Sequence, residues 1–180
     1  SGRHLYALAH NRDPRPVQVG RRRRSIGSQR ALGRAPKSPA TLDAPLVGLV
    51  DRLGRRLRAA HRICRTVVLR LRFDDFSRAT RSHTLADSTA DTETILGTAR
   101  ALLALATPII TSPGITLLGI SLSNLADHTD FQLTLPFERQ PEGALDASLD
   151  ALRERFGSQA VTRAVLIGRD PGLSVPLLPD

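Results

Sequence analysis

Arginine, glycine and serine residues near the N-terminus form the first pattern with chemical potential. Four arginines, Arg21 to Arg24, run directly into Ser25-Ile26-Gly27-Ser28. Guanidinium groups bind phosphate through charge-assisted hydrogen bonds, and small residues let a phosphate approach backbone N–H groups. A later segment, Ser77 to Leu85, combines Arg78 and Arg81 with several hydroxyl side chains. Both segments indicate phosphate binding, although a solvated basic linker is the alternative for the first.

The charge of the chain also favours a polyanionic partner. The 180 residues carry 26 Lys and Arg against 17 Asp and Glu, a net charge of +9, and Lys37 is the only lysine. Residues 1–40 hold ten of these cations and one acid, Asp13. Aromatic residues make up only 3% of the chain and none is Trp, so a platform of aromatics for base stacking is not expected.

Other kinds of site have weaker support. His61 and Cys64 could share a metal ion, but no second pair completes the site, and burial in the core is the simpler expectation for Cys64. His83 could approach a phosphate or simply lie on a strand surface. No nucleophile-elbow motif accompanies the serines, and most acids fall at expected turns and helix starts. We therefore expect no catalytic residue and no metal site.

Hydrophobic periodicity predicts three helices. Apolar residues three and four apart predict a helix over about 45–62, with Arg52, Arg55, Arg56 and Arg58 on its other faces. A second helix begins after a cap at Asp91 or Thr92 and is expected to end at Pro108. A third covers 145–156 and ends at Gly157.

Strand patterns surround the first two helices. Alternating or β-branched segments predict strands over 24–32, 67–73, 77–85 and 115–125. The resulting order, β-α-β-β-α-β, predicts an α+β fold with a four-stranded sheet and two helices on one face, followed by a C-terminal extension. The opposite face of the sheet would be left free to bind a long charged molecule.

Four motifs on these elements resemble those of a known family. They are Arg24-Ser25-Ile26-Gly27-Ser28, Phe73-Asp74-Asp75-Phe76, Thr80-Arg81-Ser82-His83-Thr84-Leu85 and Leu118-Gly119-Ile120-Ser121-Leu122-Ser123-Asn124-Leu125. Their order and spacing resemble the little-finger, or C-terminal, domain of Y-family DNA polymerases, most closely those of the bacterial polymerase IV type. Residues 1–13 are similar to the end of the thumb domain. Gln29 and Leu32 stand where the family more often has Glu and Phe, which affects local contacts rather than the fold.

The resemblance implies a division of the chain into four parts. Residues 1–20 would be the end of the thumb and a linker, 21–130 the little finger, 131–137 a sliding-clamp-binding motif, and 138–180 a partly flexible tail with one helix. The palm and fingers, where the parent polymerase would bind Mg²⁺, would lie outside these 180 residues. The chain itself would then need no cofactor.

The resemblance further implies that the little finger grips a template-primer DNA duplex by its phosphates. The expected contacts come from the first and third strands: Arg24, Ser25, Gly27, Ser28, Arg30, Arg78, Thr80, Arg81 and Ser82. For the hydroxyl residues the alternative is ordinary strand propensity, and for the arginines it is a solvated face.

A separate motif follows the last strand. Gln132 to Phe137 resembles the bacterial motif that binds the β sliding clamp. Leu133, Leu135 and Phe137 would enter apolar pockets, Gln132 would make orienting hydrogen bonds, and Pro136 would reduce the entropy lost on docking. A short edge strand packed on its own sheet is the alternative.

Two functions remain open from the sequence. The chain is the DNA-gripping and clamp-docking part of an error-prone translesion DNA polymerase used in DNA damage tolerance, or it is the same module from a catalytically inactive relative that acts as a clamp adaptor in a mutagenesis complex. In both cases we expect a monomer in the bacterial cytoplasm, associated with the nucleoid or replisome. No apolar run approaches the roughly 18 residues of a membrane span, so no membrane partner is expected. The tail helix could pack on the little finger or become ordered only with a partner.

Overall fold

The predicted order β-α-β-β-α-β is found in the chain, with further elements before and after it. The computed structural model describes residues 2–16, 23–33, 38–110, 114–128 and 143–169. The elements are α1 Gly2–Ala9, β1 Ser25–Ala31, α2 Pro39–Ala59, β2 Arg62–Phe73, β3 Arg78–Thr89, α3 Thr92–Ile110, β4 Ile115–Ser123, β5 Ala126–Asp127, α4 Ala144–Phe156 and the 3-10 turn η2 Ala164–Leu166. The predicted order runs from β1 to β4, whereas α1, β5 and η2 were not predicted.

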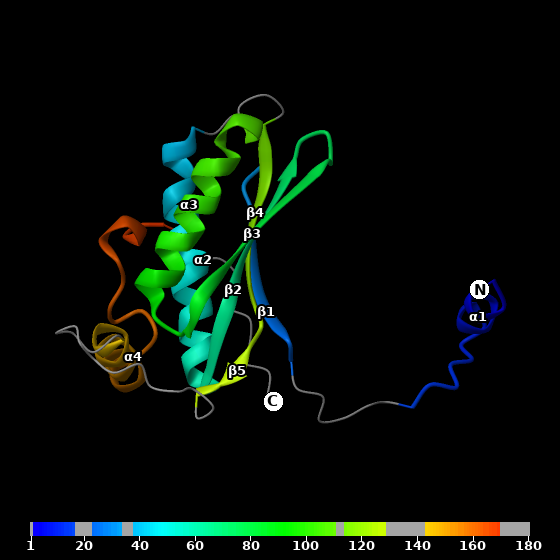
Figure 1. Cartoon of the computed structure of the whole chain (residues 1–180), viewed down its shortest axis with the longest axis horizontal. Coiled ribbons are helices and arrows are strands. Elements are labelled where there is room, and N and C mark those ends of the chain that lie inside the picture. Colours follow the sequence, from blue (N-terminus) through cyan, green and yellow to red (C-terminus); the bar gives the residue numbers. More distant parts are fainter. Residues whose placement is uncertain (1, 17–22, 34–37, 111–113, 129–142, 170–180) are drawn as a thin grey trace.

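An antiparallel sheet in the order β1-β4-β2-β3 forms the centre of the fold, and the short β5 pairs with β2. Buried leucines set the register, because Leu69 lies opposite Ile120 and Leu71 lies opposite Leu118 on one face. Helices α2 and α3 pack against this face, and no described helix covers the other one (Figure 1). The predicted α+β fold is therefore confirmed.

The packing of helix α3 explains why the core forms between the helices and the sheet. Its buried residues recur at helical spacing, from Ile95 to Ile110, and pack with the apolar stripe of α2 and with the sheet. By length and composition α3 would qualify as a membrane span, which the sequence prediction overlooked. Its apolar stripe lies in the core instead, where each fully buried Leu or Ile contributes about 1.5–3 kcal/mol. Cys64 is also buried in this core, as expected.

The predicted start of the first helix and the predicted end of the second were both wrong. Helix α2 begins at Pro39 and contains Pro45, which was expected to begin it. Pro39 at the first helical position loses no hydrogen bond, because the N–H groups of the first turn have no helical partner. Pro45 lies in the second turn and does lack one hydrogen bond, but the fully buried Leu42 and Leu46 on either side of it keep this part of the helix in the core. Helix α3 continues through Pro108 to Ile110, since a proline in the last turn removes only one backbone hydrogen bond.

Two strands are longer than predicted. β2 begins at Arg62, five residues before the expected start, and β3 continues beyond Leu85 to Thr89. A register shift between Cys64 and Thr66 interrupts the pairing of β2 with β3. The irregularity removes the simple alternation of buried and exposed residues on which the prediction depended.

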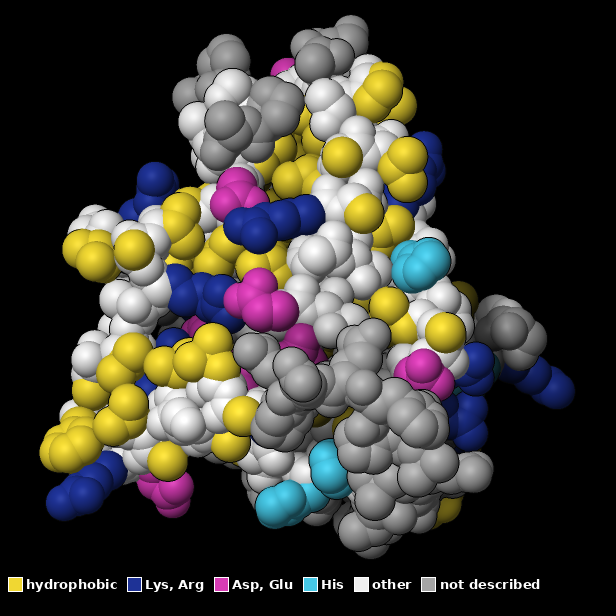
Figure 2. Space-filling model, turned by 60° about the vertical axis from the view of Figure 1, so that its left-hand side comes forward, with side chains coloured by type: hydrophobic (Ala, Val, Ile, Leu, Met, Phe, Trp, Pro, Cys, Tyr) yellow, Lys and Arg dark blue, Asp and Glu magenta, His cyan; other side chains and the backbone are white. Residues whose placement is uncertain are grey.

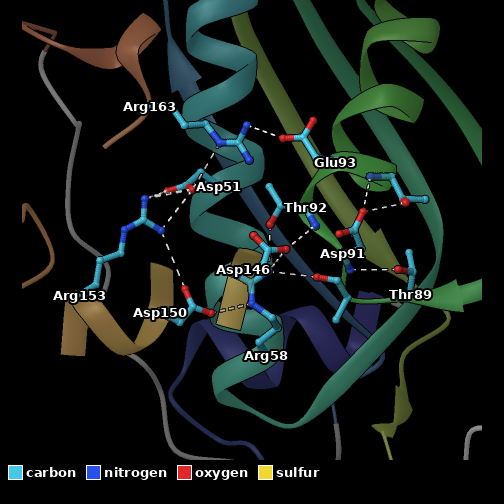
Figure 3. A network of polar contacts seen from close by, with 12 residues as sticks. Asp51, Arg58, Thr89, Asp91, Thr92, Glu93, Asp146, Asp150, Arg153 and Arg163 are labelled. Atoms are coloured by element: carbon cyan, nitrogen blue, oxygen red, sulfur yellow. Dashed lines mark hydrogen bonds and ion pairs between the residues drawn. The ribbon is translucent and has the colours of Figure 1, made fainter. Parts of the chain in front are cut away.

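The tail helix α4 packs on the domain with Asp146, Asp150 and Arg153 facing inward (Figure 3). Asp146 is only 5% exposed, and its Oδ2 accepts hydrogen bonds from the Thr92 backbone N–H at 2.7 Å and from Arg58 Nη1 at 2.9 Å. Arg58 Nε also donates to Asp150 Oδ2 at 2.6 Å. These contacts join α4 to α2 and to the N-terminus of α3.

A second part of this polar network lies further along α4. Arg153, 6% exposed, donates to Asp51 Oδ1 of α2 and to the Val161 carbonyl oxygen. Arg163 donates to Glu93 of α3 at 2.6 Å. Leu145, Leu152 and Phe156 of α4 are exposed, with Leu145 and Phe156 each 63% exposed, while Leu149 is half-buried, and hydrophobic side chains are visible at the surface in Figure 2. The predicted third helix is confirmed, but it docks through ion pairs rather than through its apolar stripe.

Candidate nucleic-acid interface

The hydrogen-bond pattern shows which backbone groups of β1 are free to bind a ligand. The Leu32 N–H donates to the Thr116 carbonyl oxygen at 2.8 Å, which places the even-numbered residues of β1 in hydrogen-bonded pairs with β4. Backbone groups of successive strand residues point in opposite directions within the sheet plane. Ser25, Gly27 and Gln29 therefore direct their N–H groups toward the free edge of the sheet.

The other free edge belongs to β3. The Phe73 N–H donates to the Ser77 carbonyl oxygen at 3.0 Å, and this fixes the alternation along the hairpin. Arg78, Thr80 and Ser82 consequently direct their N–H groups away from β2. The sheet thus presents a row of backbone donors along each edge.

Side chains of the same residues lie on the open face. Ser25 and Gly27 are opposite Ser123 and Ser121, whereas Leu122 between them faces the core. On the other side of the sheet, Arg78, Thr80 and Ser82 are opposite Arg72, Arg70 and Val68, which alternate with the buried Leu69 and Leu71. Five predicted phosphate-binding residues therefore share this face and its edges: Ser25, Gly27, Arg78, Thr80 and Ser82.

The other four predicted residues are not brought onto that face. Ser28 and Arg30 lie opposite Ile120 and Leu118, on the side of the helices. Arg81 lies opposite Leu69 on the same side, although its Nη1 reaches back to the Thr80 carbonyl oxygen at 3.2 Å. Arg24 precedes β1 and is exposed. The contacts of these four residues with phosphate remain predictions. For Ser28 and Arg30 a signal was available in the sequence, because they share the period-two alternation of Ile26 and not that of Ser25 and Gly27.

Two arginines that the sequence analysis did not select lie in the middle of the open face. Arg70 and Arg72 are on β2, and Arg70 is opposite Gly119 of β4. A Cβ atom at Gly119 would lie 3.2 Å from the Cβ atom of Gln29. Because glycine has no side chain, nothing projects from the open face at this position. Arg72 Nε is buried without a hydrogen-bond partner among the described residues. The alternation of arginine with leucine in β2 was the available signal.

Charge compensation differs between the two sides of the domain. On the helical side arginines lie beside acids, as Figure 2 shows, and Arg100 Nε is 2.8 Å from Asp43 Oδ1. The Arg100 guanidinium accordingly lowers the pKa of the Asp43 carboxyl group. No described acid forms an ion pair with Arg70, Arg72 or Arg78. The open face therefore carries uncompensated positive charge.

The remaining predicted sites are less informative. His61 is exposed while Cys64 is buried, and no three His, Cys, Asp or Glu side chains group as a metal site within the described residues. His83 is exposed on β3. The predicted clamp-binding residues lie outside the described residues: Gln132, Leu133, Leu135, Pro136 and Phe137.

Curated relatives match most of the chain. DNA polymerase IV 2 of Mesorhizobium japonicum is 38% identical over 174 residues, which are 89% of this chain and 42% of the relative. DNA polymerase IV of Streptomyces coelicolor is 37% identical over 132 residues, 73% of this chain and 27% of the relative. DNA polymerase IV of Desulfatibacillum aliphaticivorans is 31% identical over 171 residues, 93% of this chain and 43% of the relative. The chain thus spans less than half the length of these relatives.

Two further comparisons agree on the domain. A Y-family DNA polymerase chimera of known structure has the same fold, with a TM-score of 0.54 and 15% identity over 68% of this chain and 34% of the chimera. The family model for the impB/mucB/samB family C-terminal domain matches residues 23–135, more than half of the chain. The chain therefore belongs to this family and contains the C-terminal, little-finger domain of the Y-family DNA polymerases.

Proposed function

We propose that the chain is the duplex DNA-binding and sliding-clamp-docking part of an error-prone translesion DNA polymerase of the polymerase IV type. The observation that carries the DNA-binding part is the open sheet face. It combines uncompensated arginines with two free edges, and most of the outward N–H groups on these edges belong to small or hydroxyl-bearing residues. This arrangement suits the phosphates of a duplex rather than its bases, because the donors repeat along each edge as phosphates repeat along a strand.

The two kinds of donor have different roles in this proposal. Backbone N–H groups of Ser25, Gly27, Thr80 and Ser82 set the position of the phosphates, since they are fixed by the sheet. Arg78 and the neighbouring arginines supply most of the affinity by releasing counterions from the DNA. Sequence preference should therefore be slight.

A salt titration of the 180-residue chain with a template-primer duplex tests this function. If about four phosphates are neutralised, log Kd should change with log salt concentration with a slope near 3.6 in magnitude, at about 0.9 per phosphate. Arg78→Ala should reduce the magnitude of the slope by about 0.9, which is the contribution of one phosphate. Arg155→Ala changes an arginine on the outer side of α4 and should leave the slope unchanged. A flat salt response of the unmodified chain would contradict the proposal.

The clamp-docking part of the proposal rests on residues 131–137 and on the family to which the chain belongs. It is tested by titrating purified bacterial β clamp with the chain and with the double variant Leu135→Ala, Phe137→Ala. Apolar anchors dominate such interfaces, so binding should disappear in the double variant. Absence of binding by the unmodified chain would contradict the clamp-docking part of the proposal and leave the role of residues 131–137 unassigned.

The parent protein is proposed to be a DNA-directed DNA polymerase of the bacterial cytoplasm, acting at the nucleoid or replisome. Its relatives are named DNA polymerase IV, which favours the enzyme over a catalytically inactive adaptor. The described acids of this chain do not fit the Mg²⁺ site that polymerisation needs, because no three of them come together. We therefore assign Mg²⁺ and catalysis to the palm, and nucleotide incorporation by the 180-residue chain alone would overturn that assignment.

A further inference from the structure

Phe76 occupies an unusual position at the tip of the β2–β3 hairpin. Its φ angle is +65°, in the left-handed region, and its side chain is 69% exposed. The Phe76 N–H donates to the Phe73 carbonyl oxygen at 3.1 Å, which closes a turn around Asp74 and Asp75. A turn followed by one left-handed residue is a common three-residue hairpin connection, and glycine is the usual residue at that last position.

The stability of the fold does not explain an aromatic residue at position 76. A bulky side chain is strained in the left-handed region, whereas glycine or asparagine adopts it at little cost. Exposure of the ring means that little hydrophobic stabilisation offsets the strain. The turn is instead held by Asp75, whose Oδ1 accepts a hydrogen bond from the Ser77 N–H at 2.8 Å. Hydrogen bonds from the Ser77 side chain, and then from its N–H, lower the pKa of the Asp75 carboxyl group. Strain that the fold does not need is typical of residues with a binding role.

The surroundings of Phe76 indicate what it binds. Arg72 and Arg78 are cross-strand partners on the open face, at the end of the hairpin that carries Phe76. Thr80, on the same face and edge, continues the row of free backbone donors toward the other end of β3. An aromatic ring beyond a row of phosphate-binding groups can contact the sugars and base edges that line a groove of the duplex.

We propose that Phe76 is a DNA-contacting residue, which the hairpin places against the sugars and base edges of a groove while Arg72 and Arg78 bind the flanking phosphates. This inference rests on the proposed function of the open face. It differs from a base-stacking platform, because a single ring at a hairpin tip makes one apolar contact.

The test compares Phe76→Gly, Phe76→Asn and Phe76→Tyr by thermal unfolding and by fluorescence anisotropy with a template-primer duplex. The glycine and asparagine variants should keep the melting temperature of the unmodified chain or raise it by about 2–4 °C, because the strain is relieved. Both should raise Kd about tenfold, because they remove the apolar surface that the ring would bury against the duplex. Their salt slopes should be unchanged, since an apolar contact releases no counterions, and Phe76→Tyr should bind like the unmodified chain.

Leu105→Ala is the matched control, because Leu105 is a large exposed apolar residue on α3 and away from the open face. It should change neither Kd nor the salt slope. If the unmodified chain binds DNA and Phe76→Gly binds equally well, the inference about Phe76 is overturned while the proposed function stands. A lowered melting temperature or a changed salt slope in both variants would overturn it in favour of a structural role. If the unmodified chain does not bind DNA, the proposed function itself fails.

Discussion

Arg153 is an arginine in a buried position, and the partner that holds it there is Asp51 of α2. Replacing Arg153 leaves the mostly buried Asp51 carboxylate with only the longer ion pair to Arg163 Nε, at 3.9 Å. We expect Arg153→Ala to lower the free energy of unfolding by about 3 kcal/mol, measured by urea denaturation. Arg155→Ala changes an exposed arginine of the same helix and should cost less than about 0.5 kcal/mol. Equal effects of the two substitutions would contradict the role assigned to Arg153.

Cys64 provides a prediction about pH at the same scale. Burial raises the pKa of its thiol from 9.0 to about 12, because the thiolate would be desolvated in the core. Between pH 9 and 12 the unfolded chain releases this proton while the folded chain keeps it. The contribution to stability is therefore complete below pH 9 and is lost as the pH rises toward 12.

The direct measurement on Cys64 is the rate of alkylation by iodoacetamide at pH 8 and pH 9. Labelling should follow the unfolding equilibrium and become rapid in denaturant, since the folded thiol is both buried and protonated. Fast labelling of the native chain would show that the thiol is accessible.

At the scale of elements, α4 completes the N-terminus of α3. The first backbone N–H groups of a helix have no helical partner, and Asp146 accepts the one from Thr92 in addition to its ion pair with Arg58. We expect Asp146→Ala to destabilise the contact between the two helices and to accelerate hydrogen exchange of the α4 amides, while the amides of β2 and β4 stay protected. Glu154→Ala, an exposed change in α4, should leave the exchange of α4 unaltered. Unchanged protection in Asp146→Ala would refute the docking by this carboxylate.

At the scale of the whole molecule, charge is divided between a compensated helical side and an uncompensated sheet face. Binding of duplex DNA to that face should stabilise the folded chain by linkage, by about 2.7 kcal/mol at a DNA concentration of 100 times Kd. This corresponds to a rise in melting temperature of about 5–10 °C at low salt, and the rise should vanish at high salt. The double variant Arg70→Ala, Arg72→Ala should lose most of the rise, while its melting temperature without DNA changes little. A salt-independent rise would mean that contacts other than phosphates dominate binding.

The sequence predicted the elements and their order because these depend on neighbours in the chain. Leu69 and Leu71 alternate with arginines, and this alone identifies a strand with one apolar face. Ile95 to Ala106 repeat at helical spacing for the same local reason. The start of α2 and the end of α3 were misplaced, because a proline inside a helix does not end it where buried apolar residues continue on both sides.

The candidate site was predicted only in part. The phosphate-binding segments were chosen as whole motifs, so residues of both faces were selected together, and Arg70 and Arg72 were passed over although the alternation in β2 marks them. Which N–H groups reach a free edge depends on the pairing partner of each strand. The N–H groups of Ser25 and Gly27 reach a free edge because β1 pairs only on its other side, with β4, which begins 90 residues after the start of β1.

By itself, the sequence determined the α+β pattern, the basic character and the family of this protein, since composition, periodicity and motif order are properties of the chain as written. Only the tertiary structure decided which predicted residues share the open face, and that the charged side of α4 rather than its leucines meets the domain. Arg58 and Asp150 are 92 residues apart, and Asp51 and Arg153 are 102 apart. Pairs so distant in the chain leave no periodic signal, because a hydrogen bond between them depends on the folded path of every element in between.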